Sequence, residues 1–397
     1  MKDMENYRIA WLFPSLEGAS YWHPVLSEFT KIFTQTVVYT GSWPGFASGF
    51  ENAFQVKVVG KVKFIEVADS TSYVPNFTYA SPKIVSYLLQ FKPDVIFTSS
   101  FSIWTVLALL LKFLGRWKVV ITYDGSSPTY DYRNSPFRLF FRRLMAWWAD
   151  AFITNSQAGK AYLTEVLGAT EDRVFAQPYE VPDPEAMQVS SSNDQNILKD
   201  RKPIFLFIGQ LIHRKGLHYL IEACALLKAQ GISDYTLLVI GTGSEQQEFQ
   251  ELSQSHGLEG CIEWIGQVSY EHLSTYFINS DVFVFPTLED TWGMVVLEAM
   301  SFGKTVLCSK WAGTSEMITE SENGYIFDPY QPETLTSLMQ RFIESPALSI
   351  QMGEKSRQMI TPHTPKAVAE FLAKVVGSVS AENDCQQVIY STKNAKP

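Results

Sequence analysis

The chain has 397 residues, of which 46% are hydrophobic and 18% charged, a composition typical of a soluble globular protein with room for two domains. The formal net charge of −9 argues against nucleic acid as a partner. No apolar run reaches the length of a membrane span, and the first residues lack a signal-peptide pattern. The four cysteines have neither metal nor pairing spacing, so we expect free thiols and a cytoplasmic protein.

The first half of the chain alternates between predicted strands and helices. Strands are expected at residues 7–13, 36–39, 54–67, 93–98, 117–123 and 150–155, and helices at 22–33, 81–90, 104–114 and 136–148. This alternation predicts a mostly parallel sheet covered on both faces.

A polar segment then interrupts the pattern. Pro182-Asp-Pro184 and the Ser- and Asn-rich residues 190–196 are the expected linker. Beyond it, strands are expected at 204–208, 235–240, 261–265, 281–285 and 305–309, and helices at 217–228, 245–256, from 270, 294–300, 332–344, 347–359 and 364–379. We expect residues 381–397 to form a flexible tail. The sequence therefore predicts an α/β protein with two doubly wound domains.

The most informative residues follow the apolar strand 281–285. They begin Pro286-Thr-Leu-Glu-Asp-Thr-Trp-Gly and lead into a helix that is expected to stop near Gly303. A helix that starts directly after a buried strand points its unpaired N–H groups at the carboxyl edge of the sheet, where α/β proteins bind ligands.

Two carboxylates bracket this helix start, Asp290 before it and Glu298 in its second turn. A phosphate on the N–H groups of Gly293, Met294 and Val295, with sugar hydroxyls on the carboxylates, would fit a nucleotide sugar. An ordinary strand–helix unit with solvated acids remains an alternative for these residues.

The pattern Asp290-Thr-Trp-Gly, followed after four residues by Glu298-Ala-Met, resembles a signature of retaining nucleotide-sugar glycosyltransferases of family four. The first acid of that family is usually Glu, whereas here it is Asp290. The resemblance covers most of the chain and is strongest over residues 204–328. It implies the GT-B architecture, in which two Rossmann-like domains face a central cleft. Residues 1–190, joined by the helix at 364–380, would be the acceptor side, and residues 191–363 would bind the donor.

A second motif follows strand 204–208. Gly209 permits close backbone approach, and Lys215 is a mobile cation just before a helix. Cations held in place before the reaction stabilise the charge on a leaving diphosphate. The segment resembles the family's Gly-Arg-Leu-(three)-Lys-Gly motif, with Gln210 at the Arg position, and Arg214 is a candidate for the missing charge. A solvated basic turn is the alternative.

Weaker signals come from four other turns. In the family, the loops that correspond to Gly241 and Val268 lie near the nucleotide, and Gly18 falls where relatives have a glycine loop near the donor phosphates. Asp124 stands where many relatives place a histidine-containing turn, which implies hydroxyl binding or proton transfer. The loops at Gly241 and Val268 could equally be plain turns, Asp124 could merely cap a turn, and the match at Gly18 is weak because only one glycine is present.

The resemblance implies roles for these residues. Glu298 would bind the ribose, Asp290 the transferred sugar, and Lys215 with Arg214 the diphosphate. It implies metal-independent, retaining transfer from a UDP-, GDP- or ADP-sugar to a hydroxyl acceptor, which could be a glycan, a lipid-linked sugar or a small molecule, with no bound cofactor. The nearest metal-like run, Asp183-Pro-Glu185, falls in the expected linker.

The sequence also bears on three other classes of protein. A dehydrogenase is disfavoured because no Gly-x-Gly-x-x-Gly follows the first strand. A GT-B phosphorylase or epimerase would need a cofactor lysine or a separate catalytic acid, which the sequence does not indicate. A noncatalytic sugar-nucleotide-binding protein stays open because of the changes at Gln210 and Asp124.

Helix 136–148 is cationic and aromatic in an otherwise acidic protein. Arg138, Arg142 and Arg143 could contact anionic lipid while the aromatics enter the headgroup zone, which would place the protein at the inner membrane face beside a lipid-linked acceptor. A helix packed inside an α/β domain would also need a wide apolar face.

Overall fold

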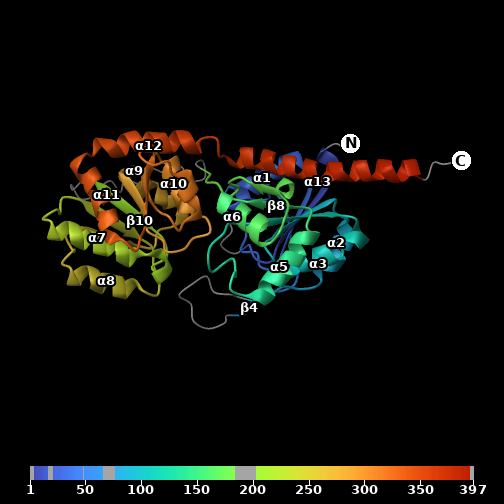
Figure 1. Ribbon diagram of the computed structural model, residues 1–397, viewed down its shortest axis with the longest axis horizontal. Helices are drawn as coiled ribbons and strands as arrows, with labels where there is room; N and C mark the ends of the chain where they lie inside the picture. Colours follow the sequence, from blue (N-terminus) through green and yellow to red (C-terminus); the bar gives the residue numbers. More distant parts are fainter. Residues whose placement is uncertain (1–3, 17–20, 48, 66–76, 184–202, 394–397) are drawn as a thin grey trace. The chain divides into compact units, whose positions relative to one another are not determined.

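The computed structural model describes the chain except for residues 1–3, 17–20, 48, 66–76, 184–202 and 394–397 (Figure 1). Gly18 and the linker residues 190–196 therefore lie outside the described residues. The chain divides into two compact units. Unit 1 comprises Met1–Glu180 and His363–Pro397, and unit 2 comprises Val181–Pro362.

Unit 1 is built on a seven-stranded parallel sheet in the order β3-β2-β1-β6-β7-β8-β9. Its strands are β1 Arg8–Phe13, β2 Gln35–Thr40, β3 Gln55–Val58, β6 Val95–Ser99, β7 Lys118–Tyr123, β8 Ala151–Thr154 and β9 Val174–Ala176. A separate antiparallel pair is formed by β4 Lys63–Ile65 and β5 Phe77–Tyr79.

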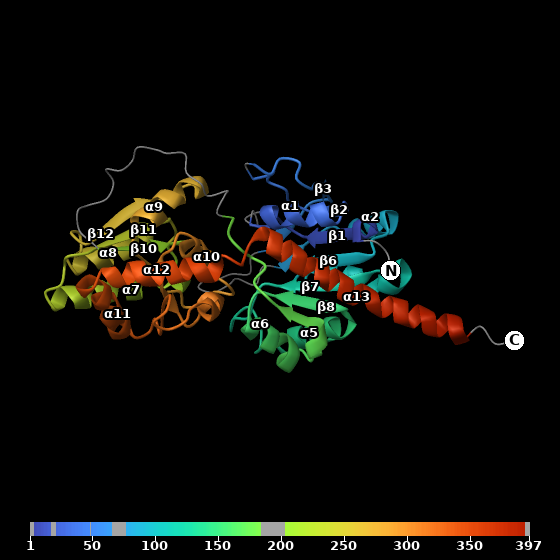
Figure 2. The same cartoon turned by 90° about the horizontal axis from the view of Figure 1, so that it is seen from above.

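The helices of unit 1 cover this sheet. They are α1 Trp22–Ile32, α2 Ile84–Phe91, α3 Ile103–Leu110, α4 Lys112–Gly115, α5 Pro136–Trp148, α6 Gln157–Ala161 and α13 Pro365–Lys393. Helix α13 belongs to unit 1 although it follows unit 2 in the chain, and it packs along α1, as both views show (Figure 2). It also continues to Lys393, through most of the stretch where the sequence predicts a flexible tail.

Unit 2 is built on a six-stranded parallel sheet in the order β12-β11-β10-β13-β14-β15. Its strands are β10 Ile204–Ile208, β11 Thr236–Ile240, β12 Ile262–Gly266, β13 Val282–Phe285, β14 Thr305–Ser309 and β15 Gly324–Phe327. Its helices are α7 Leu217–Ala229, α8 Gln246–Ser255, α9 Leu273–Asn279, α10 Met294–Ser301, α11 Pro332–Glu344 and α12 Ala347–Ile360.

The central strands β10, β11, β13 and β14 of unit 2 are apolar because both faces of the sheet are buried there. Alternate residues of β10 enter different cores: Phe205 and Phe207 pack on one face, whereas Ile204 and Leu206 pack on the other. The same alternation explains the unbroken apolar run of β13. Both strands were predicted from this composition, and the predicted bounds of β10 are confirmed.

Several elements differ from the sequence-based expectation. The single helix predicted for residues 104–114 is divided at Leu111 into α3 and α4. The short elements α6, β9 and β15 were not predicted, because three to five residues give no clear periodicity. The predicted bounds of α5 are confirmed.

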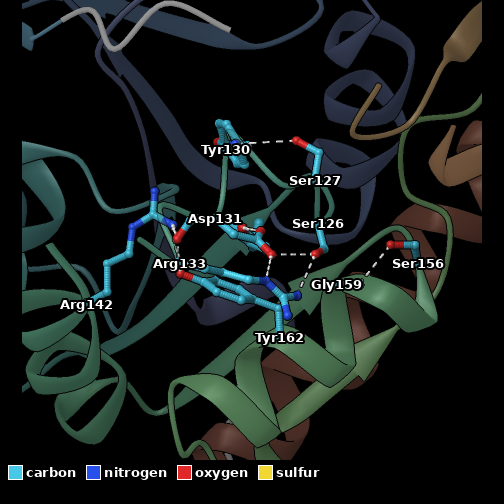
Figure 3. Close-up of polar contacts among 10 residues, drawn as sticks. Ser126, Ser127, Tyr130, Asp131, Arg133, Arg142, Ser156, Gly159 and Tyr162 are labelled. Atoms are coloured by element: carbon cyan, nitrogen blue, oxygen red, sulfur yellow. Dashed lines mark hydrogen bonds and ion pairs between the residues drawn. The ribbon is translucent and has the colours of Figure 1, made fainter. Parts of the chain in front are cut away.

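Helix α5 turns an arginine inward. Arg142 is 8% exposed, and its Nη1 donates to the Tyr162 hydroxyl (3.0 Å) and to the Asp131 carbonyl (3.2 Å) (Figure 3). The guanidinium also lies over the Tyr132 ring, 4.9 Å from its centroid. The expectation that Arg142 contacts lipid is therefore wrong: these hydrogen bonds and rings compensate its charge inside unit 1.

Candidate functional site

The sheet of unit 2 reverses its strand order between β10 and β13, which pair as parallel neighbours. In open α/β sheets, ligands bind beyond the carboxyl ends of the strands at this reversal. The loop after β10 carries Gly209 to Gly216, and the loop after β13 carries Pro286 to Gly293. The two motifs selected from the sequence are thus brought together.

Lys215 and Asp290 form an ion pair across these loops. Lys215 Nζ donates to Asp290 Oδ2 at 2.5 Å, and Arg214 Nη1 lies 3.5 Å from the same oxygen. The three side chains are between 10% and 15% exposed, so little water screens their charges. Two cations therefore converge on one carboxylate at the edge of the sheet.

The backbone holds the Arg214 end of this group in place. The Arg214 carbonyl accepts from Leu288 N (2.8 Å) and from Thr287 Oγ1 (3.1 Å), and Arg214 Nη1 donates to the Glu289 carbonyl (2.7 Å). Gly216, with φ of 68°, ends the turn and begins α7. A Cβ at Gly216 would lie 2.0 Å from the Pro286 carbonyl oxygen, so only glycine allows this approach.

Unpaired N–H groups lie at the start of α10. Within the described part of the chain, the N–H groups of Gly293, Met294 and Val295 donate to no protein oxygen, while Val296 N donates to the Gly293 carbonyl (3.0 Å). Gly293 has φ of 103°, and a Cβ there would lie 2.8 Å from the Phe285 ring. These donors and the helix dipole form a site suited to an anion.

Glu298 is buried in α10 and has a partner that the sequence did not indicate. Its Oε1 accepts a hydrogen bond from the Tyr270 hydroxyl at 3.1 Å. Burial raises the pKa of Glu298 to about 7, and the hydrogen bond from Tyr270 opposes this shift. Burial and then the charge of Glu298 raise the pKa of Tyr270, which therefore remains a donor.

Backbone hydrogen bonds join three neighbouring strand ends of unit 2. Gly209 N donates to the Ile240 carbonyl (3.0 Å), and Gly241 N donates to the Gly266 carbonyl (2.8 Å). Gly241 has φ of 131°, and a Cβ there would lie 1.9 Å from the Gly209 carbonyl oxygen. Only glycine therefore fits at position 241, whereas a Cβ at Gly209 would meet nothing nearer than 3.5 Å.

Two other residues that are predicted to bind the donor, Gln210 and Val268, are less closely connected to the Lys215–Asp290 ion pair. Gln210 is exposed, so the position of the family's arginine carries a solvent-facing amide. Val268 is partly buried and packs against the core beneath α10.

Asp124 belongs to a separate cluster in unit 1. Its carboxylate accepts from the Tyr179 hydroxyl at 2.8 Å, and its carbonyl accepts from Asn155 Nδ2 at 2.9 Å. Asn155 Oδ1 in turn accepts from the N–H groups of Tyr179 (2.8 Å) and Glu180 (3.0 Å). Burial raises the pKa of Asp124, although the Tyr179 hydrogen bond lowers it. Tyr179 and Asn155 lie far from Asp124 in the sequence and have no motif of their own, so sequence reasoning missed both.

No metal-binding group is evident where the structure describes the chain: no three His, Cys, Asp or Glu side chains converge there. Within the same described residues, every helix is too short or too polar to cross a membrane.

Solved structures with similar folds identify the architecture. HepE from Anabaena in complex with UDP is 17% identical, with a TM-score of 0.72 over 94% of this chain and 100% of that one. Sucrose-phosphate synthase from Thermosynechococcus elongatus is 18% identical, with a TM-score of 0.70 over 95% and 100% of the two chains. Two Rossmann-like units with a cation–carboxylate group at a strand reversal thus define a protein of the GT-B fold.

Family comparison agrees with this fold. Residues 34–178 match Glycosyltransferase Family 4, and residues 190–359 match Glycosyl transferases group 1. The chain belongs to the family-four glycosyltransferases.

Curated relatives match only part of their length. An uncharacterized glycosyltransferase of Haemophilus influenzae is 27% identical over 43% of this chain and 50% of the relative. The alpha-D-kanosaminyltransferase of Streptomyces kanamyceticus is 25% identical over 40% of each chain. The chain thus spans half of the first of these two curated relatives and 40% of the second.

Proposed function

We propose that this protein transfers a sugar from a nucleoside-diphosphate sugar to a hydroxyl acceptor, with retention of anomeric configuration and without a metal ion. The observation that carries the proposal is the convergence of Lys215 and Arg214 on Asp290 next to the unpaired N–H groups of α10. A diphosphate would compete with Asp290 for the two cations and would accept hydrogen bonds from Gly293, Met294 and Val295.

The transfer follows from this arrangement. The bond between the anomeric carbon and the diphosphate oxygen breaks, and its electron pair stays on the diphosphate. Lys215, Arg214 and the N–H groups stabilise that charge before and during cleavage. The acceptor oxygen bonds to the anomeric carbon, and its proton passes to the leaving diphosphate. Asp290, released from Lys215, accepts hydrogen bonds from hydroxyls of the transferred sugar.

Glu298 is proposed to bind the ribose. An ionised carboxylate can accept from two neighbouring hydroxyls, and one oxygen of Glu298 already accepts from the Tyr270 hydroxyl. UDP-sugars are the first donors to test, because the HepE structures with this fold contain UDP, or UDP-glucose. We propose that Asp124 binds a hydroxyl or holds a proton, as a carboxyl with a raised pKa can.

The cellular location is also a proposal. Cys224, Cys261 and Cys308 are buried free thiols, which suits a reducing compartment, and we propose the cytoplasm.

Slow hydrolysis of the donor tests the proposal without a known acceptor. The protein is incubated with UDP-, GDP- and ADP-sugars, and released nucleoside diphosphate is measured, with Lys215→Ala as control. We expect the wild type to hydrolyse one of these donors and the Lys215→Ala variant not to hydrolyse it. Proton NMR of the freshly released sugar should show the same anomer as the donor. Binding without turnover would favour a noncatalytic protein, and appearance of the opposite anomer would overturn retention.

A further inference from the structure

An exposed apolar face covers α4 and α5 of unit 1. We define this apolar face by six residues whose side chains are exposed: Phe113, Leu114, Phe137, Phe140, Leu144 and Trp147. Phe113 is 78% exposed, Trp147 74% and Phe137 73%, which is unusual for such large side chains. Isolated exposed apolar residues need no explanation, but a contiguous group of this size marks an interaction surface.

The two helices carry one continuous surface because they are joined at their ends. Lys112 Nζ, at the start of α4, donates to the Trp148 carbonyl at the end of α5 (2.9 Å). Phe113 and Trp147 are the direct chain neighbours of these two residues. Helix α5 also packs against α3, which leads into α4.

The apolar stripe of α5 faces outward by helical spacing. Phe137, Phe140, Leu144 and Trp147 follow the three- and four-residue intervals of one helix face. The opposite face buries Arg142, which the hydrogen bonds of Asp131 and Tyr162 hold inside the unit (Figure 3). Helix α5 thus buries one arginine beside Met145 and Ala146 and leaves large apolar side chains exposed.

The charge around the apolar face is positive. Residues 103–150 contain seven Lys or Arg and three Asp in a chain with a net charge of −9. Asp150 pairs with Lys112 and Lys118, and Asp131 accepts from the Arg133 side chain. Arg116, Arg138 and Arg143 are exposed and, within the described ranges, form no ion pair.

We propose that the apolar face docks onto a bilayer of anionic phospholipid. Aromatic side chains suit the headgroup zone, and the three arginines complement lipid phosphates. A second copy of the chain fits less well, because a two-fold contact would bring the same arginines against each other. Given the transferase activity proposed above, on which this step rests, the acceptor would be a lipid-linked hydroxyl compound at the membrane surface.

Flotation with lipid vesicles tests the docking. Wild type should float with phosphatidylglycerol vesicles at low salt but not with phosphatidylcholine vesicles. Changing Phe113, Phe137, Phe140 and Trp147 to Ser should abolish flotation. Changing Arg116, Arg138 and Arg143 to Ser should lower the partition coefficient on the order of 100-fold, from about 1 kcal/mol for each cation near the surface.

Matched controls lie elsewhere on the chain. Ile278, Tyr330 and Ile350 are exposed apolar residues of unit 2, and their change to Ser should leave flotation intact. The exposed cations Lys57, Lys355 and Lys366 provide the matched control for charge. Circular dichroism shows whether each variant is folded. Donor hydrolysis, measured without lipid, shows whether its donor site is intact.

Three outcomes would overturn the docking proposal. Wild type could fail to float, or the aromatic variant could float equally well. Light scattering could instead show a dimer that the aromatic variant converts to monomer, which would assign the apolar face to a second copy. Failed flotation with intact donor hydrolysis would leave the proposed transferase activity standing.

Discussion

Lys215 and Asp290 lie 75 positions apart in the sequence, yet Lys215 Nζ donates to Asp290 Oδ2 at 2.5 Å. In the proposed reaction this ion pair must break, because Lys215 then binds the diphosphate and Asp290 binds the transferred sugar. In this proposal, the pair holds both side chains in position for different parts of one ligand.

Lys215→Ala should slow donor hydrolysis about 100-fold or more, because it removes a charge aimed at the leaving group. The affinity for the nucleoside alone should change little, since the nucleoside lacks the diphosphate. Initial rates and calorimetry measure the two effects. A matching Asp290→Asn variant should lower turnover while keeping nucleotide affinity, and equal loss of both would contradict this division of roles.

Gln210→Arg should raise activity little. Gln210 is exposed, and Arg214 already places a guanidinium 3.5 Å from Asp290 Oδ2. The comparison is the rate of donor hydrolysis in wild type, Gln210→Arg and Arg214→Gln. A large gain in the first variant would mean that Arg214 does not replace the family's arginine.

Glu298→Gln should remove a pH dependence of stability. Burial raises the pKa of the Glu298 carboxyl from its ordinary value of 4.5 to about 7. Between these two values, the folded protein keeps a proton on Glu298 that the unfolded chain releases. The stabilisation from this difference is complete below pH 4.5 and is lost as pH rises through 7. The wild type should therefore lose on the order of 3 kcal/mol relative to the variant over this range, measured by urea unfolding.

Donor binding should respond to pH in the opposite direction. The ribose hydroxyls need the ionised carboxylate, so wild-type affinity should rise between pH 6 and 8 while that of Glu298→Gln stays flat. A nucleotide sugar is the appropriate probe because its diphosphate diester does not titrate there. Parallel pH curves for the two proteins would exclude Glu298 from the ribose site.

Gly216→Ala should destabilise unit 2 by more than about 1 kcal/mol, because a Cβ would lie 2.0 Å from the Pro286 carbonyl oxygen at a positive φ of 68°. Gly209→Ala is the matched control, since its nearest contact would be at 3.5 Å. Thermal unfolding should separate the two variants. Similar melting temperatures would show that the backbone around Gly216 relaxes freely.

Arg142→Ala should destabilise unit 1 by about 3 kcal/mol or more, because it empties a buried site and leaves the Asp131 carbonyl with one partner fewer. Arg143→Ala, one residue away and exposed, should cost less than about 1 kcal/mol. Urea unfolding measures both. Equal effects would mean that Arg142 is not held as its contacts indicate.

Helices, strands and motifs could be predicted from the sequence better than the contacts between distant residues. Strands such as β10 were predictable because burial on both faces demands an unbroken apolar run. The motifs that contain Lys215 and Asp290 were also predictable, because both follow strands. Their ion pair was not, since it depends on β10 and β13 being neighbours in the sheet. No sequence pattern around Tyr270 predicts its hydrogen bond to Glu298.

Helix α5 shows a different limit. Its periodicity predicts an amphipathic helix and its bounds, but not which face turns inward. That choice depends on Asp131 and Tyr162, which offer Arg142 a carbonyl and a hydroxyl from other parts of the unit. The spacing of residues within one helix cannot predict hydrogen-bond partners that come from distant segments of the chain.

The return of α13 to unit 1 affects the order in which the protein can fold during synthesis. Leu372, Val375 and Val376 of α13 are buried in a unit whose strands all lie before residue 181. The ribosome makes the whole of unit 2 before these residues emerge. The face of α1 that α13 covers therefore stays bare on the nascent chain while unit 2 can already fold, so the first unit to be synthesised is the last to be completed.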